Sequence, residues 1–148
     1  MEFARPRSAD VARRAAELAA RQLAADGRVQ LIFLFGSAAD PGRAVVRDVD
    51  LAVLTEPAVP FDELMRLRAD LIAATGVEID LVSLNGAPVV LAHEVAESGC
   101  CLYARTPDAE VEFVTRARSR YWDFKPFLDE QWRCAGERLR ERQDGAAV

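Results

Sequence analysis

The sequence predicts an α/β (α+β) fold, a sheet flanked by helices and followed by a C-terminal helical extension. Two observations indicate this class. Up to residue 106, short apolar segments rich in β-forming residues alternate with segments of helical length. From residue 107 onward, apolar residues recur mostly every three or four positions, which is typical of an amphipathic helix. A length of 148 residues suits one domain. We expect a core in residues 1–106 and an extension of the same domain in residues 107–148.

The first helix is expected to begin at Ala9, after an N-cap at Ser8, and to end near Gly27. Its buried face is predicted from the spacing of Val11, Ala15, Leu18 and Ala19. Three apolar strands are expected to follow, over residues 29–35, 48–54 and 77–84. The first of these is almost continuously apolar, so it is predicted to be central and covered on both faces.

Further helices are expected over residues 61–76 and 88–98, and a short edge strand over residues 100–104. Pro126 is expected to break or kink the C-terminal helical region after Lys125. This region combines aromatic residues with arginines, a composition typical of protein interfaces. We therefore expect the segment after Pro126 to contact a helical partner.

Composition excludes several classes of protein. A net charge of −5 argues against a protein held to nucleic acid by a general basic field. Apolar runs fall far short of the roughly 20 residues that span a bilayer. The first ten residues do not resemble a signal peptide, so we expect a cytoplasmic protein. Three cysteines without paired spacing are expected to be reduced and mostly buried.

Asp48 and Asp50 stand one residue apart at the start of the second apolar strand. Side chains alternate along a strand, so both carboxylates point the same way. A third carboxylate, Asp80, lies between Ile79 and Leu81, where an apolar strand is expected to hold no charge. If the two strands are neighbours, the three carboxylates converge, and hard oxygen ligands of this kind suit Mg²⁺.

Gly36 and Ser37 end the first strand. Glycine allows a phosphate to approach the backbone closely, and serine adds a hydroxyl donor. A phosphate cradle beside three carboxylates predicts phosphoryl or nucleotidyl transfer with metal ions.

Gly36-Ser37, ten further residues and then Asp48-Val49-Asp50 match the G-S-x10-D-x-D signature of the polymerase-beta-like nucleotidyltransferase superfamily. Chain size, and DLAVL followed by EIDLVSL, resemble its minimal nucleotidyltransferase (MNT) branch. The resemblance implies a small mixed β-sheet nucleotidyltransferase core that binds ATP with Mg²⁺. It implies that Asp48, Asp50 and Asp80 are catalytic metal ligands, and that Gly36 and Ser37 hold the triphosphate.

MNT proteins without a second domain resemble the antitoxin half of a toxin–antitoxin pair. The resemblance thus implies a hetero-oligomer with a helical HEPN-domain ribonuclease toxin, which the protein inactivates by transferring AMP to a tyrosine. Two alternatives remain open. One is adenylylation of a small molecule such as an aminoglycoside, which generally needs a larger acceptor domain. The other is a degenerate antitoxin that acts by binding alone.

One departure from the family pattern concerns the loop after Ser37. Relatives often carry a basic residue and a glycine here, where this chain has Asp40 and Pro41. A carboxylate near a triphosphate is repulsive. We expect Arg43 or Arg47 to supply the missing positive charge for nucleotide binding.

Overall fold

The computed structural model of the chain describes residues 7–146. Its helices are α1 (Ala9–Ala24), α2 (Phe61–Thr75), α3 (Val89–Ser98) and α4 (Pro107–Ala146), with a short 3₁₀ helix η1 (Gly36–Ala39). Its strands are β1 (Arg7–Ser8), β2 (Val29–Phe35), β3 (Val45–Val46), β4 (Val49–Thr55), β5 (Ile79–Ser83) and β6 (Cys100–Ala104). The predicted fold class is confirmed.

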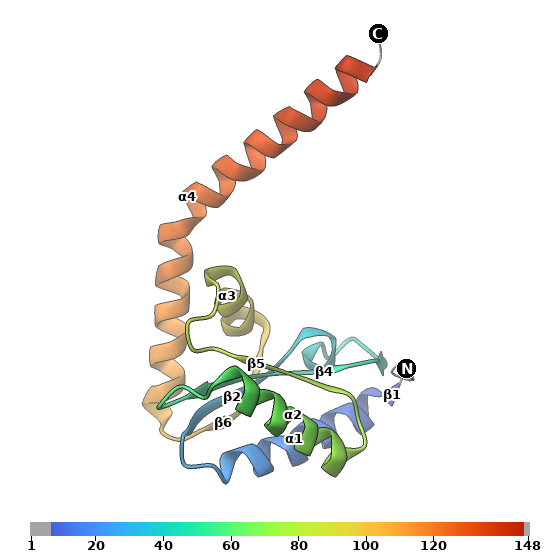
Figure 1. Cartoon of the computed structure of the whole chain (residues 1–148), viewed down its shortest axis with the longest axis vertical. Coiled ribbons are helices and arrows are strands. Elements are labelled where there is room, and N and C mark those ends of the chain that lie inside the picture. The colour runs from blue at the N-terminus through green and yellow to red at the C-terminus, as the bar shows by residue number, and fades with distance from the viewer. Residues whose placement is uncertain (1–6, 147–148) are drawn as a thin grey trace.

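The main sheet is mixed and has the strand order β5-β4-β2-β6. β4 and β5 are parallel, whereas β2 runs antiparallel to both β4 and β6. β2 is therefore an inner strand and β6 an edge strand, as predicted. β1 and β3 form a separate antiparallel pair. Helices α1 and α2 cover one face of the sheet, and α3 and the first half of α4 lie on the other (Figure 1).

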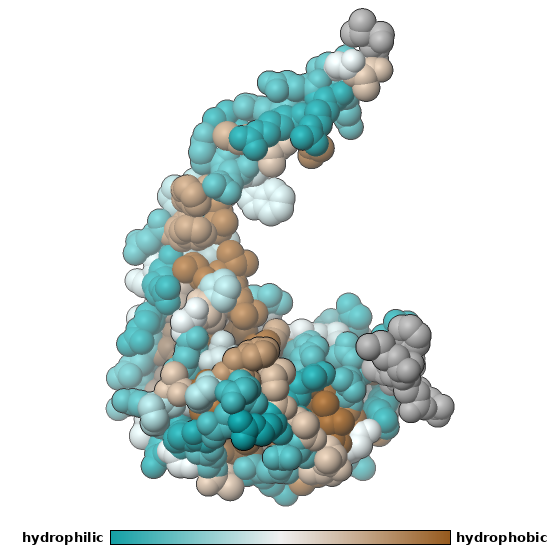
Figure 2. All heavy atoms as spheres, viewed as in Figure 1, coloured by the Kyte–Doolittle hydropathy of each residue, from teal (hydrophilic) through white to brown (hydrophobic). Residues whose placement is uncertain are grey.

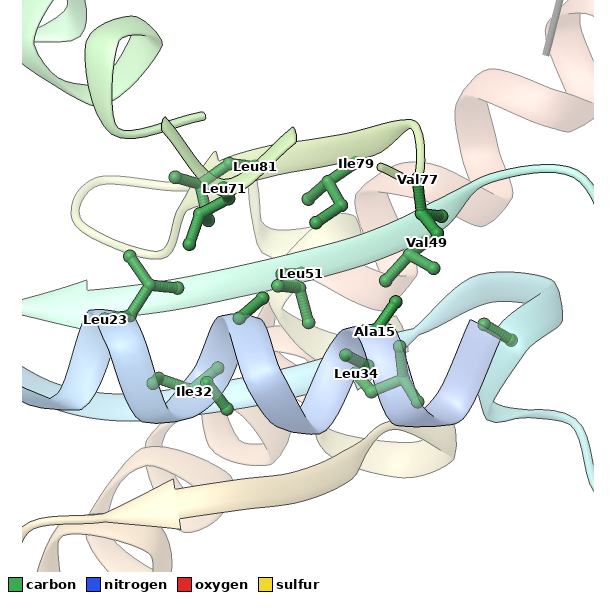
Figure 3. Close-up of a cluster of buried hydrophobic side chains, with 14 of the residues drawn as sticks. Ala15, Leu23, Ile32, Leu34, Val49, Leu51, Leu71, Val77, Ile79 and Leu81 are labelled. Carbon is green, nitrogen blue, oxygen red and sulfur yellow. The ribbon is translucent and has the colours of Figure 1, made fainter. Parts of the chain in front are cut away.

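The larger core lies between the sheet and the helices α1 and α2 (Figure 3). Alternate residues of neighbouring strands point into it, among them Ile32, Leu34, Val49, Leu51 and Ile79. The residues between them, such as Phe33 and Ala52, point to the opposite face and pack with Val95 of α3. Asp50 belongs to this second alternation, so it faces the α3 side of the sheet.

The predicted buried face of α1 is partly wrong. Ala15 and Ala19 are buried, but Val11 is 42% exposed and Leu18 is 47% exposed. The buried face consists instead of Ala12, Ala15, Ala16, Ala19, Ala20 and Leu23. Small side chains let the helix lie close to the sheet, so packing favoured the alanine strip over the larger residues beside it. The helix also ends earlier than predicted, at Ala24.

The C-terminal region is one continuous helix, α4, that changes direction about midway (Figure 1). Pro126 lies in the middle of its sequence. A proline removes one backbone hydrogen bond and crowds the preceding turn, which kinks a helix without always ending it. The prediction of a kink is confirmed. No helix in the described part of the chain is both long and apolar enough to cross a membrane.

The cysteines are less buried than the sequence predicts. All three are free thiols. Cys100 is exposed, and Cys101 and Cys134 are partly buried. Cys100 and Cys101 lie on the edge strand β6, and Cys134 lies on the second half of α4, where no other element covers it.

Candidate active site

Gly36 lies where β2 gives way to η1, and its backbone conformation is left-handed, with φ of 69°. A Cβ atom at this position would lie 2.4 Å from Oδ2 of Asp50. The left-handed backbone angle favours glycine here, and a Cβ atom would in addition force the carboxylate of Asp50 to move. The structure thus places the Gly36-Ser37 turn directly against Asp50, the second of the predicted acidic residues.

The register of the sheet brings the predicted carboxylates together. Asp50 lies opposite Asp80 in the parallel pair of β4 and β5. Asp48 precedes β4 by one residue and is two residues from Asp50, so strand geometry turns both toward the same face. We call Asp48, Asp50 and Asp80 the acidic site.

The acidic site concentrates negative charge at a partly buried position. The pKa of Asp50 is raised from 3.8 to about 6. Burial is the largest cause, followed by the negative charges of Asp80, Asp48 and then Glu94. Glu94 comes from α3, and the sequence analysis missed it. No sequence pattern around Glu94 predicts that it lies near the acidic site, because only the packing of α3 on the sheet brings it near Asp50.

Arg68 of α2 is a second residue that the sequence analysis missed. Its Nη2 atom lies 3.4 Å from Oδ1 of Asp80 and 2.8 Å from Oε1 of Glu78. Its Nε atom donates a hydrogen bond to the backbone oxygen of Ile79 at 2.7 Å. Arg68 therefore neutralises part of the charge at the outer edge of the acidic site, where the Asp80 side chain is 55% exposed.

The donors of the acidic site fit a hard divalent cation, because carboxylate oxygens are the ligands that Mg²⁺ prefers. A cation would also relieve the repulsion that raises the pKa of Asp50. The three side chains of the acidic site stand farther apart than direct coordination of one metal ion requires. Across residues 7–146, no three acidic, histidine or cysteine side chains lie close enough to enclose a metal ion as they stand.

The loop between η1 and β4 holds the residues that depart from the family pattern. Asp40 accepts a hydrogen bond from the backbone N–H of Gly42 at 2.9 Å. Its Oδ2 atom lies 3.8 Å from Nε of Arg43, and both side chains are more than half exposed. Asp40 therefore stabilises its own turn, and Arg43 partly balances its charge. Arg47 is exposed directly before Asp48.

A cavity of about 640 Å³ lies away from the acidic site. It adjoins Thr55, at the far end of β4 from Asp50, and about the first four turns of α4. Five residues separate Asp50 from Thr55, which is about 16 Å along a strand. Asn85 closes one side by donating to the backbone oxygen of Thr55 at 2.8 Å and accepting from its N–H at 3.0 Å. The cavity and the acidic site are thus separate features of the α3 side of the sheet.

Comparison with known proteins identifies the family. The sequence profile described as "Polymerase beta, Nucleotidyltransferase" matches residues 19–108. The curated protein adenylyltransferase MntA of Shewanella oneidensis is 32% identical over 94 residues, which are 64% of this chain and 67% of that protein.

Solved structures with the same fold include chains of toxin–antitoxin complexes. The MntA–HepT complex matches with a TM-score of 0.63 and 26% identity over 80% of this chain and 98% of that one. A toxin–antitoxin complex with AMP-PNP matches with a TM-score of 0.63 and 26% identity over 78% and 98%. A tri-AMPylated Shewanella oneidensis HEPN toxin in complex with MNT antitoxin matches with a TM-score of 0.60 and 25% identity over 80% and 98%.

These matches confirm the resemblance to MNT proteins that the Gly-Ser and Asp-x-Asp motifs indicated. The chain belongs to the polymerase beta nucleotidyltransferase family.

Proposed function

We propose that this protein is an adenylyltransferase antitoxin, which transfers AMP from ATP to a tyrosine of a cognate HEPN ribonuclease toxin and so inactivates it. The observation that carries the proposal is that the Gly-Ser turn, the Asp-x-Asp motif and Asp80 lie next to one another. Gly36 lies against Asp50, and Asp50 lies opposite Asp80. Relatives that share this fold are named as an adenylyltransferase and as antitoxins in toxin complexes. Such a protein would work in the cytoplasm, where ATP is available.

In this proposal, Asp48 and Asp50 are the principal ligands of Mg²⁺, with Asp80 as the third carboxylate. When bound, Mg²⁺ supplies positive charge to the triphosphate and to the acidic site. Gly36 and Ser37 receive the triphosphate through backbone N–H groups and the serine hydroxyl. Arg43 and Arg47 are exposed between η1 and β4, and we assign to them the positive charge that relatives carry at other positions.

The transfer itself is a substitution at the α-phosphorus of ATP. The tyrosine oxygen forms a bond to this phosphorus, the bond to the bridging oxygen breaks, and pyrophosphate leaves. The phenolic proton goes to Asp80. Among the acidic residues on these strands, Asp80 suits this role because its side chain is 55% exposed, so an acceptor arriving from solvent can reach it.

The test measures transfer of labelled AMP from ATP, labelled at the α-phosphate, to the purified cognate toxin with Mg²⁺ present. We expect the wild type to label a toxin tyrosine, and Asp50→Asn to lower the rate at least about a hundredfold. Asp70→Asn is the matched control, since Asp70 is an exposed carboxylate on α2 outside the acidic site. Equal rates of AMP transfer for wild type and Asp50→Asn would show that the acidic site takes no part in the reaction.

One observation favours the alternative of an antitoxin that acts by binding alone. The contact between Arg68 and Asp80 occupies a carboxylate that catalysis needs. A wild-type protein that silences the toxin without any transfer of AMP would establish that alternative. The small-molecule alternative is less well supported, because residues 107–146 form a single helix rather than an acceptor-binding domain.

A further inference from the structure

The second half of α4 stands apart from the rest of the fold. We call residues 126–146 the arm. No side chain between Pro126 and Ala146 is buried. The first half of α4 is different, since Ala117 is buried and Phe113 and Val114 pack on the core beside α3. The match to the family ends at residue 108, so the arm lies outside the shared catalytic core.

One face of α4 is apolar along both halves. In the first half this face carries the buried Ala117 and Tyr121, whose ring stacks on His93 of α3 with centroids 3.6 Å apart. Helical periodicity carries the same face into the arm at spacings of three, four and seven residues. Its members there are Leu128, Trp132, Ala135 and Leu139, which we call the arm stripe. The apolar face of α4 that packs against α3 therefore continues into the arm, where its side chains are not buried.

The arm stripe exposes large apolar side chains that folding within this chain does not explain. Trp132 is 76% exposed and Leu139 is 59% exposed. Burying side chains of this size removes apolar surface from water and so stabilises the complex that covers them. The recorded contacts of the arm's side chains lie along the helix itself, such as those of Arg133 with Glu130 and Glu137. The arm stripe therefore leaves a strip of apolar surface uncovered among the charged residues of the arm, and exposed apolar surface of this kind marks a site for a partner.

The arm and the acidic site lie on the same side of the sheet. Asp50 faces the α3 side, and α4 rises from that side and bends over it (Figure 1). Figure 2 shows a wide hollow between the arm and the body, with hydrophobic side chains gathered where the helix bends. A molecule that fills this hollow can contact the arm and the acidic site together. Residues 126–146 extend over about 30 Å as a helix, so an occupant that covers the arm is of protein size.

We propose that the arm stripe docks an apolar helical surface of the toxin and holds its acceptor tyrosine over the acidic site. The proposal rests on the proposed function, because that function makes a protein the acceptor. A second copy of this chain is the competing occupant, and it would leave the acidic site without its acceptor. Specificity for one toxin then resides in a segment outside the catalytic core, where it can vary without disturbing the chemistry.

The experiment compares the double variant Trp132→Ala/Leu139→Ala with Trp122→Ala in the full chain. Trp122 is the matched control, since it is 64% exposed on the same helix but follows Tyr121 by one residue. It therefore points about 100° away from the stripe. We expect the double variant to bind the toxin at least about tenfold more weakly, which is one step of 1.4 kcal/mol. The KM for toxin should rise while kcat at saturating toxin changes little, because docking acts on binding.

Two further measurements keep the test decisive. Thermal melting and MgATP binding of the double variant should match those of the wild type, since the stripe supports neither. Amide hydrogen exchange of the wild type should slow across residues 126–146 when toxin is added, a readout that needs no variant.

The outcomes separate this proposal from the proposed function. A wild type that labels the toxin, with a double variant that binds and labels equally well, would overturn the docking role alone. A wild type that binds through the arm but transfers no AMP would overturn the catalytic function and leave docking in place. A free protein that is dimeric until the stripe is mutated, with unchanged toxin affinity, would assign the stripe to a second copy.

Discussion

The acidic site and the arm both expose groups that this chain does not satisfy, but the groups are opposite in kind. At the acidic site, carboxylates face one another, and repulsion and burial raise the pKa of Asp50. In the arm, some charges are paired within the helix, as in Arg133 with Glu137 at 2.7 Å, and large apolar side chains are left uncovered. Unpaired charge indicates a site for ions or a charged substrate. Uncovered apolar surface indicates a site for another protein.

The largest effect is expected at Gly36, where the acidic site leaves no room. Gly36→Ala forces a left-handed backbone on alanine and pushes a Cβ atom against Asp50. We expect a loss of stability of about 2–3 kcal/mol. AMP transfer should fall at least about a hundredfold, because small displacements of reacting groups are costly. Denaturant unfolding and the transfer assay measure the two effects.

Gly76→Ala is the matched control for that variant. Gly76 has φ of 68°, nearly the same as Gly36, but no atom lies within 4 Å of its added Cβ. It should lose about 1–2 kcal/mol of stability, from the backbone angle alone, and keep its transfer rate. Similar transfer rates in the two variants would show that the close approach of Gly36 to Asp50 has no effect on AMP transfer.

A smaller effect is expected from the charge of Asp50 itself. Because its pKa is raised in the folded state, the folded protein binds more protons than the unfolded chain between about pH 4 and pH 6. This contribution to stability is therefore present at low pH and is lost as the pH rises through about 6. Asp50→Asn should remove this dependence. At pH 7 in a chelator it should be more stable than the wild type by about 1–2 kcal/mol, a value reduced for solvent screening.

Unfolding of metal-free protein at about pH 4 and pH 7 measures this difference. Other titrating groups are common to wild type and variant, so they largely cancel in the comparison. A variant that is less stable than the wild type at pH 7 would show that the carboxylate of Asp50 makes a favourable contact instead.

The smallest effect is expected from the charges of the arm. Arg133 contacts Glu130 at 2.5 Å and Glu137 at 2.7 Å, and all three side chains are more than half exposed. Exposed ion pairs of this kind contribute little and are screened by salt. Arg133→Ala should leave the melting temperature and AMP transfer unchanged, and should only speed amide exchange in the arm at low salt. Cooperative destabilisation of the whole protein would show that the arm belongs to the core.

The sequence by itself determined the main helices, the strands of the main sheet and which acidic residues stand out from their surroundings. Strand alternation turned Asp48 and Asp50 to one side, and an apolar context made Asp80 stand out. Gly36 was identified for its approach to phosphate, and its closeness to Asp50 came only from the structure. These local features can be predicted from the sequence because each depends on a few neighbouring residues.

Tertiary structure decided which distant residues meet. The parallel pairing of β4 and β5 placed Asp80 opposite Asp50, and the packing of α3 and α2 brought Glu94 and Arg68 to the same place. Packing also chose the alanine strip of α1 over Val11 and Leu18, because close approach to the sheet favours small side chains. The apolar period of α4 was visible in the sequence, but only the fold shows that its first half is covered and its second half is not. Periodicity specifies a face of a helix, and the presence of a neighbour decides whether that face is buried.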